Sequence, residues 1–266
     1  MSVITLLTDF GLQDEYAGVM KGVILAINPA AVLVDVTHQI DSRDVVQAAF
    51  VIHGAYRFFP GGSVHLVVVD PGVGTGRAIL ALKAGGHVFI APDNGVLTLL
   101  LEKIQTPSLF RLTNEAFYLR PVSGTFHGRD IMAPVAAHVS RGTALEEIGV
   151  PIDPEQAVRL EDLAPVICAD GRVEGRIVAV DSFGNLITSI DSATLARACN
   201  RGPMNKVQVK IGRQTINGLS QTYGNVAADR LLALVGSRGY LEIAVNQGSA
   251  ARRLKVKKRD VVRLIP

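Results

Sequence analysis

The chain has 266 residues, of which 48 % are hydrophobic and 19 % are charged. This composition is typical of a well-packed globular protein and excludes a disordered chain. The net charge of +3 is too small to predict by itself a polyanionic partner such as a nucleic acid.

The first part of the chain alternates between strand and helix patterns. Apolar, mostly β-branched runs predict strands at Val3–Thr8, Val32–Val36 and Val64–Val69. Apolar residues at helical spacing predict one helix from Asp14 to Asn28 and another from Asp44 to Tyr56. Because helices that connect successive strands place those strands parallel, this order predicts an α/β domain with a mainly parallel central sheet.

Shorter elements follow, and then two segments that contain proline. The expected strands are Ala78–Leu82, Val88–Ala91 and Leu109–Leu112, and the expected helices are Val96–Ile104 and a segment that runs from Asp130 through Val139. The segments Pro151–Glu155 and Asp162–Pro165 predict a linker region, because proline-rich stretches are typical of domain boundaries.

Beyond this region the helical patterns nearly vanish. Glycines separate the predicted strands Arg176–Val180, Leu186–Ile190, Val207–Ile211, Leu231–Val235, Tyr240–Val245 and Val261–Leu264, with one short helix at Ser192–Ala198. This spacing predicts a smaller all-β, barrel-like domain. We therefore expect an α/β domain at residues 1–160, a linker at 161–170 and a β-barrel domain at 171–266.

The end of the chain is basic. Six of the eight residues of Arg252–Arg259 are Lys or Arg. A solvated edge strand with Lys255 and Lys257 on one face is the expected structure, and an RNA-binding surface is the alternative.

The two cysteines, Cys168 and Cys199, show neither a CxxC pattern nor a metal-ligand spacing. Two free thiols in a reducing compartment are therefore expected.

No basic signal-peptide segment precedes the first strand. The apolar run Gly22–Val34 is interrupted by Asn28-Pro29 and falls short of the ~20 residues that a membrane-spanning helix needs. These features predict a cytoplasmic protein.

A buried-strand pattern at Val67–Val69 ends abruptly in Asp70-Pro71-Gly72, and a glycine-rich loop then leads to Arg77. An acid at the end of a strand, followed by such a loop, is how α/β proteins present polar groups to a ligand. The glycines match neither of the common phosphate-binding loops. The alternative is a tight hairpin turn with a solvated Asp70–Arg77 ion pair.

Other polar loops follow predicted strands or precede predicted helices. His127 comes directly before a helix, although a lone histidine is more often structural. The motifs are Thr8–Gly11, Asp35–His38, Asp70–Gly74, Ala91–Gly95, Phe126–Asp130, Phe183–Asn185 and Ser237–Tyr240.

In this order, over residues 3 to 250, these motifs resemble the S-adenosyl-L-methionine (SAM) hydroxide adenosyltransferase family. This family of SAM hydrolases is related to the fluorinases and chlorinases that halogenate SAM at C5′. The resemblance implies hydrolysis of SAM to adenosine and L-methionine by a homotrimer with sites between subunits, with SAM as substrate and no cofactor. No nucleic-acid or membrane partner is implied.

The resemblance also implies roles for individual residues. Asp70, Arg77 and His127 match the set that orients or deprotonates the attacking water. Asp9 matches the carboxylate that grips the ribose diol, and Asp181 matches the acid that faces the methionine ammonium. The other implied substrate contacts are Asp14, Tyr16, Ser237 and Arg238 near the amino-acid end, Asn185, Val245 and Gln247 at the adenine edge, the aromatic rings of Phe183 and Tyr223, and Gly128.

Three departures from the halogenases favour water over halide as the nucleophile. Asp70 stands where the halogenases have Tyr, a long insertion near Lys83–His87 is missing, and Arg43 replaces an aromatic residue near the sugar. Arg77 stays protonated and cannot act as a base. Either Asp70 or His127 is able to accept the proton of water, and the sequence leaves both open.

Two other functions are compatible with these residues. One is a metal-dependent hydrolase of another 5′-substituted adenosine that uses Asp70, Asp93, His127 and Asp130. The other is a module that binds SAM or adenosine without turnover. Sensitivity to a chelator distinguishes the first from the metal-free scheme, and turnover distinguishes the second.

Overall fold

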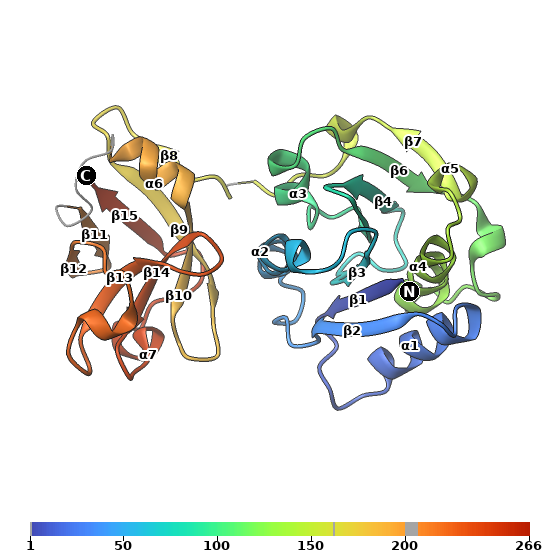
Figure 1. Cartoon of the computed structure of the whole chain (residues 1–266), viewed down its shortest axis with the longest axis horizontal. Coiled ribbons are helices and arrows are strands. Elements are labelled where there is room, and N and C mark those ends of the chain that lie inside the picture. The colour runs from blue at the N-terminus through green and yellow to red at the C-terminus, as the bar shows by residue number, and fades with distance from the viewer. Residues whose placement is uncertain (1, 162, 200–206) are drawn as a thin grey trace. The chain divides into compact units, whose positions relative to one another are not determined.

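The computed structural model describes residues 2–161, 163–199 and 207–266. The chain divides into two compact units, Met1–Leu160 and Glu161–Pro266, each with its own sheet and its own hydrophobic core (Figure 1). The first unit combines a sheet with helices, and the second is built on an antiparallel sheet. The predicted fold class is therefore confirmed. No helix in the described ranges is long and apolar enough to cross a membrane.

The sheet of the first unit has seven strands in the order β2-β1-β3-β5-β4-β6-β7. The strands are β1 (Val3–Thr8), β2 (Val32–Thr37), β3 (Val64–Val68), β4 (Ile79–Ala84), β5 (His87–Pro92), β6 (Ser108–Leu112) and β7 (Gly149–Ile152). The helices are α1 (Tyr16–Ile27), α2 (Val45–Ala55), α3 (Thr98–Lys103), α4 (Ala133–Ser140) and α5 (Leu145–Ile148), with 3-10 turns at Tyr56–Phe58, Glu115–Phe117 and Pro154–Gln156 and a π-helical turn at Gly128–Met132.

The sheet has a parallel half and an antiparallel half. Strands β2, β1, β3 and β5 run parallel, whereas β4, β6 and β7 pair with antiparallel neighbours. The predicted linker segment Pro151–Glu155 is wrong in its first part, because Pro151 lies in β7 opposite Phe110. Proline is tolerated there because β7 is an edge strand, where a missing N–H breaks no ladder.

Helices cover both faces of this sheet (Figure 1). On one face, Ile4 and Leu6 of β1 pack with Met20 and Ile24 of α1 and with α4, all of them buried. Helix α2 begins where the sequence predicts, because the Asp44 side chain accepts a hydrogen bond from the backbone N–H of Gln47 at 2.8 Å. These contacts hold the carboxyl ends of β1 and β3 side by side, with Thr8 opposite Val68.

The second unit is a nearly closed antiparallel sheet in the order β12-β11-β15-β9-β10-β14-β13, with β8 also paired to β9. An isolated bridge between Ser220 and Leu234 connects the segment after β12 to β13. The strands are β8 (Val166–Ile167), β9 (Val173–Val180), β10 (Leu186–Asp191), β11 (Gln208–Ile211), β12 (Gln214–Asn217), β13 (Leu231–Val235), β14 (Tyr240–Val245) and β15 (Val261–Ile265), and the helices are α6 (Ser192–Ala198), α7 (Ala250–Leu254) and a 3-10 turn at Tyr223–Asn225.

The edge strand predicted for Arg252–Arg259 is wrong. Arg252 lies in helix α7, which begins because the Ser249 side chain accepts a hydrogen bond from the Arg252 N–H. Lys255 ends this helix in the left-handed region at φ 53°. Three of the described strands were not predicted: β7 in the first unit, β8, which lies within the predicted linker, and β12, which pairs with β11 as a hairpin.

A buried histidine pair in the first unit makes stability depend on pH. His65 is fully buried, with Nδ1 2.8 Å from Thr5 Oγ1 and Nε2 3.2 Å from His87 Nδ1. Burial, and secondarily the nearby His87, lower the pKa of His65 from 6.5 to about 3. As the pH falls below 6.5, His65 therefore binds a proton in the unfolded chain but not in the folded protein, and the folded protein loses stability.

We expect acidification from pH 6.5 to pH 5 to destabilise the wild type by about 2 kcal/mol more than the His65→Leu variant. The variant loses hydrogen bonds to Thr5 and His87 and is less stable at every pH, but its stability depends less on pH. Urea unfolding at a series of pH values measures this. Equal pH dependence of the two proteins would contradict the assignment.

Candidate active site

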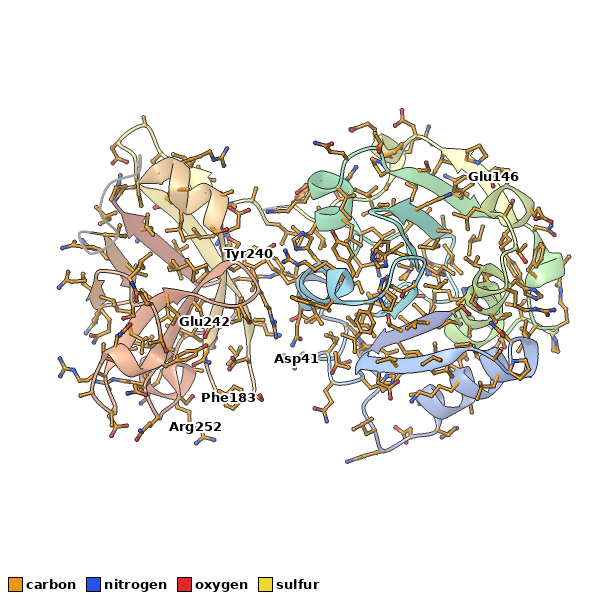
Figure 2. The ribbon with its side chains drawn as sticks, viewed as in Figure 1. Asp41, Glu146, Phe183, Tyr240, Glu242 and Arg252 are labelled. Atoms are coloured by element: carbon orange, nitrogen blue, oxygen red, sulfur yellow. The ribbon has the colours of Figure 1, made fainter. Side chains whose placement is uncertain are left out.

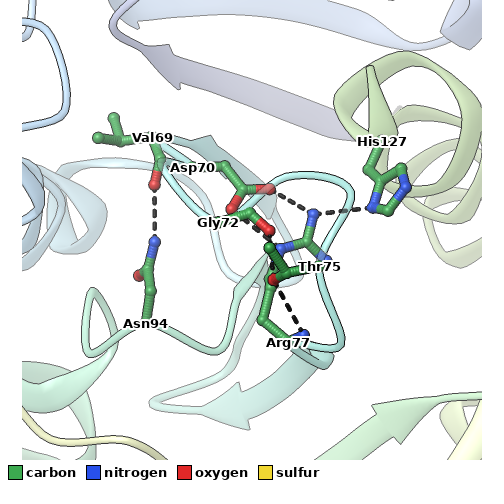
Figure 3. Close-up of polar contacts among 7 residues, drawn as sticks. All are labelled: Val69, Asp70, Gly72, Thr75, Arg77, Asn94 and His127. Carbon is green, nitrogen blue, oxygen red and sulfur yellow. Dashed lines mark hydrogen bonds and ion pairs between the residues drawn. The ribbon is translucent and has the colours of Figure 1, made fainter. Parts of the chain in front are cut away.

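At the end of β3, Arg77 connects Asp70 to His127 (Figure 3). Its guanidinium donates to both oxygens of Asp70, with Nε 2.9 Å from Oδ1 and Nη2 bonded to Oδ2. The same Nη2 lies 2.9 Å from His127 Nδ1. The side chains of Asp70 and Arg77 are 6 % and 9 % exposed, so the pair is not the solvated turn considered as the alternative.

Two contacts to the backbone hold the turn that carries Asp70 and Arg77. The Asn94 side-chain amide donates to the carbonyl of Val69 at 2.8 Å, so the Ala91–Gly95 motif supports the end of β3 (Figure 3). Gly74 has φ 78°, and a Cβ added there would overlap the carbonyl oxygen of Gly124. The loop that contains Arg77 thus packs backbone to backbone on the loop that leads to His127.

The position of His127 depends on Asp130, which is 1 % exposed. Its carboxylate accepts from the Ser123 N–H at 2.8 Å and from the Arg129 side chain at 2.6 and 2.9 Å. Burial raises the pKa of Asp130, but the bonds from Arg129 and Ser123 outweigh burial and lower it overall. Asp130 therefore stays ionised and fixes the loop that ends in His127.

The pKa of His127 is lowered, first by burial and then by the positive charge of Arg77, against the opposing charges of Asp70 and Asp130. A guanidinium only donates hydrogen bonds, so Nδ1 of His127 must be the acceptor in its contact with Arg77. The neutral ring then carries its proton on Nε2. Both observations assign a neutral imidazole at pH 7.

Asp70 and His127 border a cavity of about 710 Å³ in the first unit, whereas Arg77 lies behind them and outside the lining. Its predicted lining residues are Asp9, Tyr16, Asp70, His127 and Gly128. Phe10 and Phe126 complete one wall, with ring centroids 5.7 Å apart and 5.5 and 5.3 Å, respectively, from the Tyr16 ring. Although the quoted motifs contain both phenylalanines, the sequence did not single them out.

Arg43 also borders this cavity, and its backbone makes the polar contact. The Arg43 N–H donates to Asp9 Oδ2 at 2.8 Å. Arg43 itself has φ 65°, in the left-handed region. The neighbouring chain is fixed as well, because Gly11 N–H donates to the His38 carbonyl at 2.7 Å and His38 Nδ1 lies 2.9 Å from Thr8 Oγ1. Asp9 is therefore presented by a rigid loop.

The second unit has its own cavity, of about 810 Å³. Asp181 shapes it by accepting from the N–H groups of Phe183 and Asn185 at 3.0 and 2.8 Å and from the Asn185 side chain at 2.9 Å. The Phe183 ring is 77 % exposed. The predicted residues that line this cavity are Asp181, Phe183, Asn185, Tyr223, Val245 and Gln247.

Three residues that were predicted to contact the substrate line neither of the two cavities. Asp14 and Ser237 are exposed, and Arg238 is half-buried. Conversely, the sequence did not single out Glu242, a carboxylate that is only 6 % exposed behind Tyr223. Strand alternation assigns Glu242 to the face of β14 opposite the barrel core, where solvent is expected, so no local pattern indicates its burial.

Among residues 2–161, 163–199 and 207–266, no three His, Cys, Asp or Glu side chains gather as metal ligands would. All four residues in the metal hypothesis have other partners, since Asp70 and His127 are bonded to Arg77. Asp93 accepts from the Val158 N–H at 2.9 Å, and Asp130 is held by Arg129 and Ser123.

The chain is thus a two-domain protein. Its α/β unit carries an acid–arginine–histidine site at a strand end, and an antiparallel, barrel-like unit follows. The model of the SAM hydroxide adenosyltransferase N-terminal domain matches residues 4–149, and that of the C-terminal domain matches residues 175–263. The chain therefore belongs to the SAM hydroxide adenosyltransferase family, and the resemblance stated from the motifs is confirmed.

Individual relatives agree with this membership. The chain is 37 % identical to the (R)-S-adenosyl-L-methionine hydrolase of Thermus thermophilus, over 100 % of both chains. It is 27 % identical to a fluorinase of Nocardia brasiliensis, over 96 % of this chain and 94 % of that protein. The crystal structure of an uncharacterized conserved protein from Thermotoga maritima superposes with a TM-score of 0.91 at 38 % identity, covering 99 % of this chain and 100 % of that chain.

The close approach of Gly74 and Gly124 predicts the effect of a single methyl group. Gly74→Ala places a Cβ against the Gly124 carbonyl and forces a positive φ on alanine, so we expect a loss of about 1–3 kcal/mol of folding free energy. Gly76→Ala is the matched control, because a Cβ there meets nothing within 4 Å. Urea denaturation measures both. Equal stability of the two variants would show that the loops do not depend on this contact.

Proposed function

We propose that this chain hydrolyses SAM by attack of water on C5′ without a metal ion, with Asp70, Arg77 and His127 as the catalytic residues. The reaction class follows from family membership: the chain is an enzyme that converts SAM to adenosine and L-methionine. The observation that carries the mechanism is the pair of contacts from one arginine to Asp70 and His127, at the edge of a cavity.

The chemistry of SAM explains why such a site suffices. The sulfonium already bears a positive charge, and methionine leaves as a neutral thioether, so the leaving group needs no acid. Water is the difficult partner, because its pKa is about 15.7. Arg77 stabilises developing hydroxide by its charge, and its bonds to Asp70 hold the carboxylate in place.

The hydrogen-bond directions favour Asp70 over His127 as the proton acceptor. His127 Nδ1 already accepts from Arg77, and Nε2 carries the proton, so the neutral ring donates to water and orients it. Each Asp70 oxygen accepts one bond from Arg77 and keeps a second lone pair. We therefore assign Asp70 as the base and His127 as the residue that orients the attacking water.

The remaining predicted residues are proposed as substrate contacts. In the first unit, one carboxylate oxygen of Asp9 accepts from the Arg43 N–H, and we assign the other oxygen to the ribose diol. Tyr16, with the adjoining phenylalanines, forms an apolar wall, and Gly128 lines the same cavity next to His127. In the second unit, Asp181 receives the ammonium, Asn185, Val245 and Gln247 line the adenine edge, and Phe183 and Tyr223 supply rings. Asp14, Ser237 and Arg238 are retained as contacts at the amino-acid end.

We also propose a homotrimer with sites between subunits, as the resemblance implies, and a cytoplasmic location. The free thiols of Cys168 and Cys199 are compatible with a reducing compartment. SAM is the small-molecule partner, and neither a nucleic acid nor a membrane is proposed.

The experiment that tests this function follows oxygen from water into product. The purified enzyme, incubated with SAM in ¹⁸O-water and EDTA, is expected to release L-methionine and adenosine labelled at the 5′-hydroxyl, because water attacks C5′ directly. Mass spectrometry reads the label. Unlabelled adenosine, or activity abolished by EDTA and restored by a divalent ion, would overturn the scheme.

The proposed catalytic unit predicts non-additive mutations. Arg77→Ala removes an electrostatic donor and is expected to lower kcat by roughly 10²–10³ with little change in KM. Asp70→Asn is expected to lower kcat by a similar factor. Because both residues act on one water, the double variant should be impaired much less than the product of the two factors.

Asp9→Ala is the control for these variants, since it is expected mainly to raise KM. Unfolding is measured alongside, because removal of one partner leaves a buried charge unpaired. Near-normal turnover in both single variants, or simple multiplication of their losses, would reduce the Asp70–Arg77 loop to a structural turn.

A further inference from the structure

Glu242 is a buried carboxylate that the proposed mechanism does not use. It lies in the middle of β14 (Figure 2), on the face opposite the core residues Leu241 and Ile243. Its cross-strand partners are the aliphatic Ile187 and Leu234, and it is only 6 % exposed. A carboxylate between two aliphatic neighbours is costly unless it has a hydrogen-bond donor.

That donor is the phenol of Tyr223, which bonds to Glu242 Oε1 at 2.5 Å. The other oxygen, Oε2, occupies space that a Cβ at Gly236 would fill, so the chain provides a niche for it. Burial and the charge of Asp181 raise the pKa of Glu242, against the opposing effects of Tyr223 and Arg238. Burial and Glu242 in turn raise the pKa of Tyr223.

Tyr223 belongs to a segment that crosses the outer face of β13 and β14. One end of this segment is tied by the Ser220 N–H, which donates to the Ala233 carbonyl at 2.8 Å. The other end is tied by the Asn246 side chain, which donates to the Val226 carbonyl at 2.7 Å. The bond from Tyr223 to Glu242 attaches the middle of the segment to the sheet, and there Tyr223 lines the same cavity as Asp181 and Phe183.

We propose that Glu242 is a positioning residue for substrate: its carboxylate holds the Tyr223 hydroxyl and so fixes the Tyr223 ring as a wall of the barrel cavity. This inference rests on the proposed function, in which that cavity receives SAM. Glu242 does not line the cavity, and the residues that we assign to the chemical step all belong to the first unit. Its loss therefore weakens SAM binding and leaves the chemical step unchanged.

Steady-state kinetics of the full-length enzyme test this role. Tyr223→Phe and Glu242→Ala are each expected to raise KM for SAM about tenfold, the usual effect of losing one hydrogen bond to a charged group, with kcat within about twofold of wild type. Glu242→Gln is expected to keep a near-normal KM, because its amide oxygen still accepts from Tyr223. The double variant Tyr223→Phe/Glu242→Ala should be no worse than the poorer single variant.

The matched control is Glu174→Ala, which removes a carboxylate of the same unit that is 39 % exposed and paired with Arg263 at 2.6 Å. Such surface pairs contribute little, so KM should not change. If Glu242→Ala fails to fold, Tyr223→Phe and Glu242→Gln carry the test. An unchanged KM in Tyr223→Phe, a KM in Glu242→Gln as high as in Glu242→Ala, or a loss in kcat alone would overturn the proposal.

A second measurement does not depend on turnover. The chain has five tyrosines and no tryptophan, so tyrosinate absorbance is read without an indole background. Subtraction of the Tyr223→Phe titration from that of wild type isolates Tyr223, whose pKa is expected above its ordinary 10.0. Glu242→Gln removes the nearby charge and should lower this pKa toward 10.0.

The two measurements separate two kinds of failure. A wild type that does not turn over SAM, together with the expected Tyr223 titration, would refute the proposed function while leaving the Tyr223–Glu242 contact established. A Tyr223 pKa that does not respond to Glu242→Gln, in an enzyme that turns over SAM, would refute the positioning role.

Discussion

The buried contact between the Arg77 guanidinium and the Asp70 carboxylate is the constraint on which the site depends. A paired charge with so little exposure is stable only with complete hydrogen bonding, and the fork of Arg77 supplies this by binding both oxygens of Asp70. The remaining donor capacity of Nη2 reaches His127. One side chain thereby binds both the acid and the imidazole and joins the two loops that carry them.

That geometry requires two chain segments about fifty residues apart to meet with little tolerance. Helices and strands bring the ends of β1 and β3 together, but the final approach is made by backbone, where Gly74 packs on Gly124. Asp130 holds the second loop from the other side through Arg129 and Ser123. The contact of Arg77 with Asp70 and His127 is thus supported by a packing contact and by a further buried carboxylate.

The protein treats its buried acids in different ways. Asp70 and Asp130 are each paired with an arginine near His127, and for Asp130 this pairing lowers the pKa. Glu242 is instead bonded to a phenol and lies near Asp181, so its charge is stabilised less and its pKa is raised. The first arrangement suits a site that activates water, and the second suits a residue whose task is to hold a ring in place.

By itself, the sequence determined most of the helices and strands and predicted that polar residues gather at a strand end. β1, β13, β14 and α6 have the predicted bounds because apolar runs between glycines and caps leave few alternatives. The position of Asp70 at a strand end was also predictable, since β-branched residues followed by Asp-Pro-Gly stop a strand locally.

Only the tertiary structure decided which polar residues meet. The burial of Glu242 depends on a covering segment some twenty residues away in sequence, and the edge position of β7 depends on its pairing with β6. The Arg252 segment became a helix through the Ser249 cap, although its charges suggested an exposed strand. In each case the outcome depends on contacts in space or on a capping bond, and composition and periodicity contain no information about those.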